Sequence, residues 1–338
     1  MVELIRQSQA QSADLKDAPF LSADVGGTYA RISLVQRERG SAVKILAYRK
    51  YLCADYPELA DILRDFIAKE AKTPVKSCAL AVAGYVIDGK VINYNLPWQV
   101  SEQTLRQSLG IEALSIINDF EAVAHAASHV DSSKTTLLAG PEIGAGPLIV
   151  VGPGTGLGSA VCIPGRKRSV VLATEAGQTS LAPGDARERE VLAVLAKAGD
   201  YVSHERILCG PGMVTLYGVL SQLHGRPAQA ATPEAITLAA LDGSDPVAHE
   251  TLEMFCALLG GFVGNLALLY GARGGVYLTG GILPGMRDFL VQSRFVARFL
   301  DKGRMRAFLE RIPVRLMEHG QLGVIGAAGW YLESLEDE

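Results

Sequence analysis

The sequence lacks the patterns that mark several large classes of protein. Its five cysteines are scattered without any C-x-x-C spacing, so we expect buried thiols in a reducing compartment. It has no basic stripe and no interleaving of aromatic and basic residues, which argues against a nucleic-acid partner. The first nineteen residues are polar, and no later stretch approaches an uninterrupted apolar span of ~18 residues. These absences predict a cytoplasmic protein with no membrane association and a loose N-terminal tail.

The composition is typical of a globular protein with a large core. Of the 338 residues, 49% are apolar and 20% are charged, and the formal net charge is −4. A chain of this length predicts about two domains with ample apolar material for their cores.

A glycine-rich turn interrupts an apolar run at residues 148–160, which read Leu-Ile-Val-Val-Gly-Pro-Gly-Thr-Gly-Leu-Gly-Ser-Ala. Glycine adopts positive φ and leaves the backbone open to close approach, so successive N–H groups can converge on a phosphate. A tight hairpin between two core strands explains a single turn of this kind equally well.

A second turn of the same plan follows the strand-like residues 20–23. Asp24 lies at the end of the incoming strand, and Gly26, Gly27 and Thr28 form the turn. Asp24 could hold a hydrated Mg²⁺ ion while the amides of the turn and the Thr28 hydroxyl face the β- and γ-phosphates of a nucleotide.

A third glycine pair, Gly280 and Gly281, follows the strand-like residues 275–279. Three turns of this kind favour phosphate binding over chance hairpins. Residues 84–91 nearly match the nucleotide P-loop, but Val91 replaces the hydroxyl that would bind Mg²⁺. The residues that follow predict a strand where a P-loop requires a helix, so we reject this match.

Residues 114–126 predict a strand that runs into a helix, with Asn118 and Asp119 at the junction. The carboxyl end of a strand delivers polar side chains into a crevice, which favours a catalytic site. Asn and Asp before a helix are also common N-caps, and spacing alone favours capping. Adjacent residues can share the two roles.

Two further glycine patterns bear on packing. The predicted helix over residues 246–270 contains three glycines, Gly260, Gly261 and Gly264. Glycine costs a helix roughly 1 kcal/mol relative to alanine, so we expect close packing there against another backbone or a nucleotide. The Gly-Pro-Gly sequence at residues 210–212 predicts an interruption of regular secondary structure.

Five motifs, taken together, resemble those of the bacterial glucokinase family within the actin-like sugar kinases. They are Asp24-Val25-Gly26-Gly27-Thr28-x-Ala30-Arg31, Ile117-Asn118-Asp119-Phe120, Gly152-x-Gly154-Thr155-Gly156-Leu157-Gly158, Glu205-Arg206-Ile207-Leu208-x-Gly210-Pro211-Gly212 and Gly280-Gly281-Ile282. Their order and spacing match the family from about Phe20 to Trp330. The resemblance implies an α/β protein with a two-domain actin-like ATPase (ribonuclease H-like) fold and a central cleft.

The resemblance also implies the division of the chain. An N-terminal tail would cover residues 1–19, and a small α/β domain would cover residues 20–115 and be completed by a C-terminal helix at 319–338. Residues 116–318 would form the large α/β domain. The resemblance makes a homodimer the expected assembly. The cysteine-rich zinc motif of related sugar kinases is absent, so no structural zinc is expected.

The implied activity is that of a glucokinase, which transfers phosphoryl from ATP to the 6-hydroxyl of glucose with Mg²⁺. Asp119 would be the catalytic base that accepts the proton of the sugar hydroxyl. The implied sugar ligands are Asn95, Asn118, Asp119, Glu175, Gln178 and Glu205. The implied ATP-binding residues are Asp24, Gly26, Gly27, Thr28, Gly154, Thr155, Gly156, Gly280 and Gly281, and Asp24 would hold Mg²⁺ through water.

Three residues depart from the family pattern. The family usually reads Glu-Gly-Gly-His where this chain has Glu175, Ala176, Gly177 and Gln178. Glutamine can donate a hydrogen bond to a sugar hydroxyl but cannot carry charge, and Ala176 adds a Cβ beside the implied sugar. Tyr29 stands where the first turn usually has asparagine.

These departures keep other functions open. A kinase for another hexose or an amino sugar is one alternative, and a catalytically weak regulatory homologue that binds sugar and ATP is another. A dinucleotide dehydrogenase is a weaker alternative, because Leu157 stands where the Rossmann pattern needs its third glycine and the residues that follow predict a strand where a Rossmann fold requires a helix.

Overall fold

The computed structural model describes residues 18–38, 43–92, 96–128, 130, 135–165, 169–317 and 320–335. The chain divides into two units, one of residues 1–130, 165–171 and 319–338, the other of residues 131–164 and 172–318. The sequence-based boundary after residue 115 falls inside strand β7 (Ala113–Asn118), which belongs to the first sheet. The first unit therefore continues beyond that boundary to Val130.

The first unit is built on a five-stranded sheet with the order β3-β2-β1-β4-β7. Strand β1 pairs antiparallel with β2 and parallel with β4, and β4 pairs parallel with β7. The other strands span Phe20–Val25 (β1), Tyr29–Arg37 (β2), Val43–Leu52 (β3) and Ser77–Val82 (β4). A 3₁₀ turn, η1 (Cys53–Asp55), follows β3.

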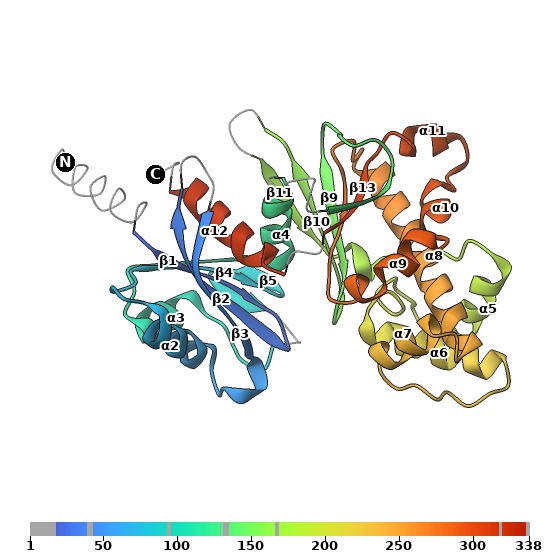
Figure 1. Cartoon of the computed structure of the whole chain (residues 1–338), viewed down its shortest axis with the longest axis horizontal. Coiled ribbons are helices and arrows are strands. Elements are labelled where there is room, and N and C mark those ends of the chain that lie inside the picture. Colours follow the sequence, from blue (N-terminus) through green and yellow to red (C-terminus); the bar gives the residue numbers. More distant parts are fainter. Residues whose placement is uncertain are drawn as a thin grey trace. The chain divides into compact units, whose positions relative to one another are not determined.

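Helices cover both faces of this sheet (Figure 1). Leu21, Ala23 and Val25 alternate with the rest of β1 and pack with helices α2 (Leu59–Glu70) and α3 (Glu102–Leu109). On the opposite face, the core includes residues of α4 (Asp119–Ala127) and α12 (Leu322–Ser334). Because side chains alternate along a strand, one strand supplies both layers of the core.

The near-match to a P-loop forms a β-hairpin. Strands β5 (Tyr85–Ile87) and β6 (Lys90–Ile92) pair antiparallel around Asp88 and Gly89, whose φ angles are 49° and 70°. Two successive residues with positive φ are typical of a tight hairpin turn. Residues 84–91 therefore do not open a helix as a P-loop does, and the sequence-based rejection of this match is confirmed.

The second unit contains a six-stranded sheet with the order β11-β10-β9-β12-β13-β8. The strands span Thr135–Ala139 (β8), Leu148–Pro153 (β9), Leu157–Ile163 (β10), Val170–Thr174 (β11), Gly275–Leu278 (β12) and Val314–Met317 (β13). Strand β10 directly follows the glycine turn, which rules out the strand-to-helix turn of a Rossmann dinucleotide site.

The helices of the second unit pack around the long helix α8 (Pro246–Leu269). They are α5 (Ala186–Leu195), α6 (Gly210–Leu223), α7 (Pro233–Leu241), α9 (Arg287–Gln292), α10 (Phe295–Leu300) and α11 (Arg306–Leu309). Short 3₁₀ turns are η3 (Ala176–Gln178), η4 (Lys197–Gly199), η5 (Leu283–Met286) and η6 (Gly303–Met305). Helix α8 is long and apolar enough to cross a membrane by length and mean composition, although Glu250, Glu253 and Asn265 interrupt its apolar residues. Because 72% of its most apolar window is buried within the protein, its composition is that of a core helix.

The glycines of α8 allow close contact with α10. A Cβ at Gly260 would overlap the carbonyl oxygen of Phe295, and one at Gly264 would lie 2.7 Å from the carbonyl oxygen of Phe299. The prediction of close packing against another backbone is therefore confirmed at these two positions. Lys302 also donates to the carbonyl oxygen of Gly261 at 3.0 Å.

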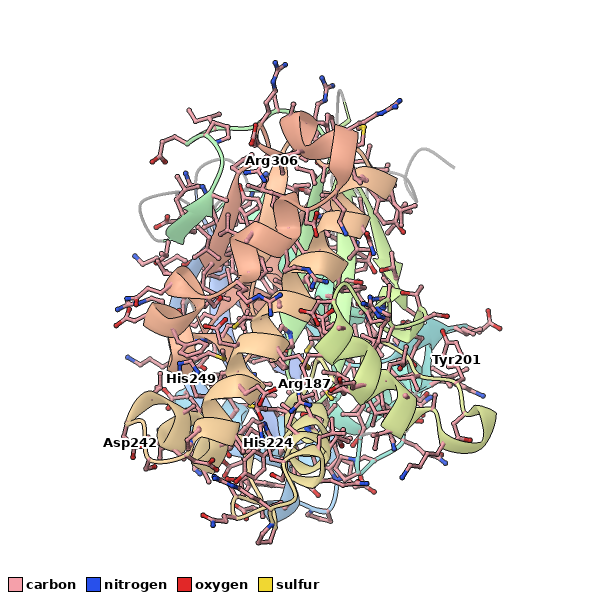
Figure 2. The ribbon with its side chains drawn as sticks, turned by 90° about the vertical axis from the view of Figure 1, so that its right-hand side faces the viewer. Arg187, Tyr201, His224, Asp242, His249 and Arg306 are labelled. Carbon is pink, nitrogen blue, oxygen red and sulfur yellow. The ribbon has the colours of Figure 1, made fainter. Side chains whose placement is uncertain are left out.

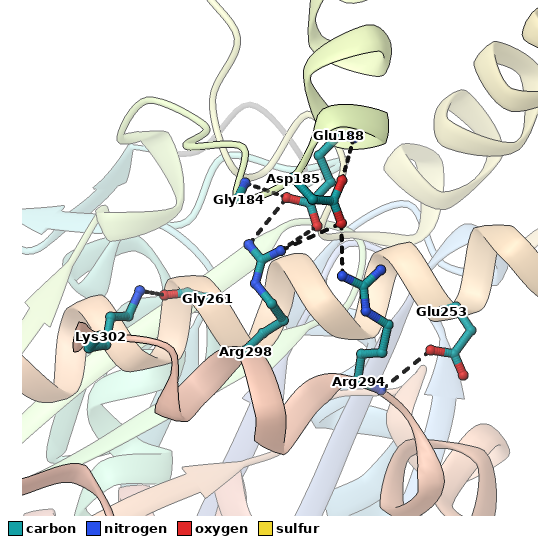
Figure 3. Close-up of polar contacts among 8 residues, drawn as sticks. All are labelled: Gly184, Asp185, Glu188, Glu253, Gly261, Arg294, Arg298 and Lys302. Atoms are coloured by element: carbon teal, nitrogen blue, oxygen red, sulfur yellow. Dashed lines mark hydrogen bonds and ion pairs between the residues drawn. The ribbon is translucent and has the colours of Figure 1, made fainter. Parts of the chain in front are cut away.

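Charged side chains link the helices of the second unit. Arg187 on α5 donates to Glu250 on α8 at 2.8 Å, and Nε2 of His224 lies 2.6 Å from the same carboxylate; Figure 2 labels Arg187 and His224. Arg298 on α10 forms a second link, to Glu188 on α5 (Figure 3).

The predicted interruption at residues 210–212 is wrong, because these residues form the first turn of α6. Sγ of Cys209 caps this helix by accepting a hydrogen bond from the N–H of Gly212 at 3.3 Å. Pro211 lies in the first turn, where proline's missing N–H costs nothing and its fixed φ suits the helix.

Candidate active site

Strand register brings two predicted motifs of the first unit to one edge of its sheet. Val25 of β1 pairs with Val82 of β4, and Val82 pairs with Asn118 of β7. The carboxyl ends of these three parallel strands therefore lie side by side. The glycine turn after β1 and Asp119 after β7 project from the same edge.

Asp24 makes an ion pair at this edge. Nη1 of Arg31 lies 3.1 Å from Oδ2 of Asp24, and 19% of the Asp24 side chain is exposed. Burial raises the pKa of the Asp24 carboxyl, and the charge and hydrogen bond of Arg31 oppose this shift. A Cβ at Gly323 would lie 2.6 Å from the Asp24 carboxyl carbon, so the first turn of α12 packs against this carboxyl.

Asn118 takes the capping role that the sequence left open for Asn118 and Asp119. Asn118 is the N-cap of α4, and its Oδ1 accepts from the N–H groups of Phe120 at 2.9 Å and Glu121 at 3.1 Å. Its Nδ2 donates to the carbonyl oxygen of Gly84 at 3.0 Å. Asp119 is the first residue of the helix, so the capping role falls to Asn118.

Glu205 lies against the second glycine turn, in the second unit. Its Oε2 accepts from the N–H of Leu157 at 2.7 Å, and a Cβ at Gly156 would lie 2.7 Å from the same oxygen. Gly210 N–H donates to the carbonyl oxygen of Gly154 at 2.8 Å. The Glu205–Gly212 motif therefore contacts the second glycine turn at both ends of the turn, through Glu205 at Leu157 and through Gly210 at Gly154.

Gln178 contacts Glu205 directly. Its Nε2 donates to Oε1 of Glu205 at 2.7 Å, while the hydroxyl of Tyr201 donates to the Gln178 carbonyl oxygen. Backbone bonds run alongside, from Glu205 N–H to the oxygen of Gly177 at 2.9 Å and from His204 N–H to the oxygen of Thr179 at 2.9 Å. The segment that carries Gln178 and the segment that carries Glu205 thus form one structural element.

His204 is a structural residue in this element. Its ring is buried, its Nδ1 lies 2.9 Å from the Thr179 carbonyl oxygen, and it packs against Phe262 with ring centroids 4.6 Å apart. Burial lowers the pKa of His204, which favours the neutral ring.

Ala176 does not add a methyl group to an exposed site. Its side chain is buried in the core of the second unit. The backbone comes closest at Gly177, where a Cβ would lie 2.5 Å from the carbonyl oxygen of Leu157. The glycine that the local backbone requires is therefore retained. Glu175, which directly precedes the η3 turn, and Gln178, which ends it, are exposed.

The third glycine pair lies beside the second turn. Thr279 N–H donates to the Val151 carbonyl oxygen at 2.9 Å, and a Cβ at Gly280 would overlap the carbonyl oxygen of Pro153. Gly280 has a φ of 99°, so the close approach and the dihedral angle both require glycine.

Both glycine turns have N–H groups available for an anion. Gly26 and Gly154 donate their N–H groups within their own turns. Four other N–H groups of the turns have no protein acceptor within the described ranges: those of Gly27, Thr28, Thr155 and Gly156. Unpaired N–H groups in a glycine turn suit phosphate oxygens. The residues present therefore fit a nucleotide phosphate group, and the Asp24 carboxylate fits a hydrated Mg²⁺ ion.

Some predicted residues are not tested by this geometry. Asn95 lies outside the described residues. Asp24, Asn118 and Asp119 belong to the first unit, whereas Glu175, Gln178 and Glu205 and the turns at 154–156 and 280–281 belong to the second. Among the described residues, no group of three His, Cys, Asp or Glu side chains could hold a metal ion by itself.

Sequence reasoning missed two partners of these residues. Arg31 lies inside the first motif. It pairs directly with Asp24 across the antiparallel strands β1 and β2, and two opposite charges on either side of a short turn were the available signal for the ion pair. The contact of Gln178 with Glu205 joins residues 27 positions apart, and no local pattern predicts it.

Comparisons with known proteins agree with the motifs. The family model for glucokinase matches residues 21–334. A glucokinase-like protein of Xylella fastidiosa (strain 9a5c) is 45% identical over 325 residues, which cover 94% of this chain and 97% of the relative. The chain belongs to the glucokinase family. A glucokinase of Paramagnetospirillum magneticum (strain ATCC 700264 / AMB-1) is 41% identical over 314 residues, which cover 91% of this chain and 96% of that one.

Solved structures of the family have the same fold. The crystal structure of a glucokinase from an Antarctic psychrotroph superimposes with a TM-score of 0.82 at 34% identity, over 95% of this chain and 99% of that one. The glucokinase-family chain described here therefore has the actin-like ATPase fold, and it is an enzyme of the sugar-kinase class. The resemblance and the fold predicted from the motifs are confirmed.

Proposed function

We propose that this chain transfers the γ-phosphoryl group of ATP to the 6-hydroxyl of glucose, with Asp119 as general base. One observation supports the proposal most directly. The ends of β1 and β7 lie in register through Val82, so the turn at residues 24–28 and Asp119 extend from the same edge of one sheet. A base and a phosphate-binding turn held by one rigid sheet suit a reaction that depends on positioning.

The residues at this edge divide the work of the proposed reaction. The Asp119 carboxylate accepts the proton of the attacking hydroxyl, and its Oδ1 is oriented by the N–H of Phe120 at 3.0 Å. N–H groups of the glycine turn at this edge bind oxygens of the transferring phosphoryl group. Asp24 holds Mg²⁺ through water, and the bound ion supplies positive charge that stabilises the transferring phosphoryl.

Contacts in the second unit support the proposed sugar ligands. Glu205 and Gln178 are hydrogen-bonded to each other, and carboxylates accept hydrogen bonds from sugar hydroxyls. The cytoplasmic location, the homodimer, the absence of structural zinc and the role of Asn95 stay predictions. None of the five cysteines forms a disulfide, in keeping with a reducing compartment.

A second candidate is a kinase for another hexose or an amino sugar. The observation that favours it is the neutral Gln178 amide bonded to Glu205, in place of an imidazole. A change of this kind beside a sugar ligand can alter the ratio of kcat/KM values between sugars.

One experiment tests both candidates. ADP release from Mg-ATP is measured with glucose, mannose, fructose, glucosamine and N-acetylglucosamine, for the wild type and for Asp119→Asn. We expect glucose-dependent turnover, at least about 10²-fold lower in Asp119→Asn, since general-base catalysis contributes about that much or more. Retained turnover in the variant would refute the role of Asp119. Turnover with a different sugar would support the second candidate, and nucleotide binding without turnover would support a regulatory protein.

A further inference from the structure

Tyr29 carries an aromatic ring at the edge of the first glycine turn. It directly follows Thr28, and 38% of the residue is exposed. The ammonium nitrogen of Lys50, from strand β3, lies 3.6 Å from the centroid of this ring. A cation at this distance over a tyrosine face is held by the electrostatic field of the ring. Tyr29 therefore keeps the Lys50 side chain beside the turn.

Lys50 is the outermost member of a charged row that crosses three strands. Asp24 of β1 pairs with Arg31 of β2, and Arg31 pairs with Lys50 of β3. Residues paired directly across antiparallel strands project from the same face of the sheet. The three charged side chains thus follow one another along one face at the end of the sheet that bears the turn.

The two cations of this row have different partners. Arg31 forms an ion pair with Asp24 at 3.1 Å. Lys50 contacts the Tyr29 ring, and none of the carboxylates in the described part of the chain forms an ion pair with it. The row therefore ends in a lysine that no acidic side chain of the described residues pairs with.

Backbone contacts fix Lys50 relative to the turn. The N–H of Cys53 donates to the carbonyl oxygen of Thr28 at 2.9 Å, and Sγ of Cys53 donates to the carbonyl oxygen of Gly26 at 3.4 Å. These bonds fasten the end of β3 to the turn, three residues beyond Lys50. The N–H groups of Gly27 and Thr28 on the same turn have no protein acceptor among the described residues.

We propose that Lys50, held in place by Tyr29, binds the terminal phosphates of the nucleotide at the first glycine turn. The inference rests on the proposed function, which assigns the turn to a nucleotide. It adds a residue outside the turn, from a neighbouring strand, whose charge complements a phosphate group. It also explains the tyrosine in the turn as the support for a lysine that lies elsewhere in the sequence.

The test compares Lys50→Met with Lys44→Met, which removes an exposed lysine from the other end of the same strand. Calorimetry measures the Kd of Mg-ATP, Mg-ADP and AMP, and kinetics measure KM for ATP and for the sugar. For Lys50→Met we expect Mg-ATP and Mg-ADP to bind about 10-fold more weakly. This is the lower end of the range expected when a hydrogen bond to a charged group is lost. The affinity for AMP, the KM for sugar and the melting temperature should not change, and Lys44→Met should match the wild type.

Two supporting variants test the role of the ring. Tyr29→Phe keeps an aromatic face and should retain nucleotide affinity, whereas Tyr29→Leu removes it and should weaken Mg-ATP binding several-fold. Lys50→Arg keeps the charge and should restore most of the affinity.

Other outcomes would overturn the assignment. Equal Mg-ADP affinity in Lys50→Met and the wild type would remove Lys50 from the nucleotide site. Weaker binding of glucose 6-phosphate or inorganic phosphate, with Mg-ADP unaffected, would assign the lysine to a sugar phosphate. The proposed function can fail on its own: the wild type would then bind Mg-ADP but turn over no sugar. In that case, the Mg-ADP affinities of Lys50→Met and the wild type still decide whether Lys50 binds the nucleotide. A wild type that binds no nucleotide would overturn both proposals.

Discussion

The buried ion pair between Glu188 and Arg298 should make a large contribution to the stability of the second unit. Only 1% of the Glu188 side chain and 11% of the Arg298 side chain are exposed. The pair is bidentate, with N–O distances of 2.8 and 3.2 Å, and the N–H of Gly184 donates to the same carboxylate at 2.5 Å (Figure 3).

The expected magnitude follows from what each variant leaves behind. In Glu188→Leu, the carboxylate that remains beside the Arg298 guanidinium among the described residues is Asp185, 3.9 Å away. Removing one partner of a buried pair costs about 3–5 kcal/mol. Because Asp185 still neutralises part of the charge, we expect about 3 kcal/mol for Glu188→Leu. The double variant Glu188→Leu/Arg298→Met should recover most of this loss, since an apolar pair leaves no unpaired buried charge.

Urea unfolding followed by two probes measures these losses. Both tryptophans, Trp98 and Trp330, belong to the first unit, so their fluorescence reports that unit. Far-ultraviolet circular dichroism also reports the helices of the second unit. The matched control is Arg306→Met, which removes an exposed i,i+4 pair with Glu310 whose side chains are 60% and 49% exposed; Figure 2 labels Arg306. We expect less than about 0.5 kcal/mol for the control. The reasoning is refuted when Glu188→Leu costs no more than the control, or when the two single losses simply add in the double variant.

Two further predictions concern stability. Gly260→Ala should cost about 1–3 kcal/mol, because its Cβ would overlap the carbonyl oxygen of Phe295. Gly261→Ala should gain up to about 1 kcal/mol, because its Cβ would lie 3.5 Å from a guanidinium nitrogen and alanine favours a helix; equal urea midpoints would contradict both. Burial raises the folded-state pKa of Asp24 above its ordinary value of 3.8 despite Arg31, so ionisation of this carboxyl opposes folding. The free energy of unfolding of Asp24→Asn should therefore increase relative to that of the wild type as the pH rises from 3.8 through the raised folded-state pKa. An increase confined to pH values below 3.8 would contradict this direction.

The glycine turns were predictable because their signals are local. Each turn follows an apolar run that forms a buried strand, as in β1 and β9. Gly280 also meets a local constraint, its positive φ of 99°. Short-range constraints of this kind can be read from one sequence without knowing which strands pair.

The start of α6 was misread although a signal was present. Gly-Pro-Gly suggests a break when glycine and proline are counted as helix breakers. Position decides the matter, because a proline in the first turn marks where a helix begins. Cys209, the capping residue, has no strong N-cap preference, so the cap could not be predicted from residue type.

Long-range polar pairs could not be predicted at all. Glu188 and Arg298 are 110 residues apart, and their helices α5 and α10 meet only in the folded unit. Lys50 and Tyr29 meet because β2 and β3 pair in a particular register, with a shift between Leu34 and Val35 that no local pattern specifies. The sequence therefore showed Tyr29 as a departure from the family, and the contact that accounts for it required the structure.

Gln178 illustrates the same limit within the candidate sugar site. From the sequence, glutamine in place of histidine is a weakened sugar ligand. In the structure, its amide and the N–H of Leu157 each hold one oxygen of Glu205, both at 2.7 Å. Two donors on opposite oxygens fix the carboxylate plane, so Gln178 orients Glu205 whether or not it contacts the sugar itself. Because an amide does not titrate in the ordinary pH range, this orientation does not depend on the protonation of residue 178. The substitution thus replaces a titratable donor with a neutral one while the second unit keeps its carboxylate in place.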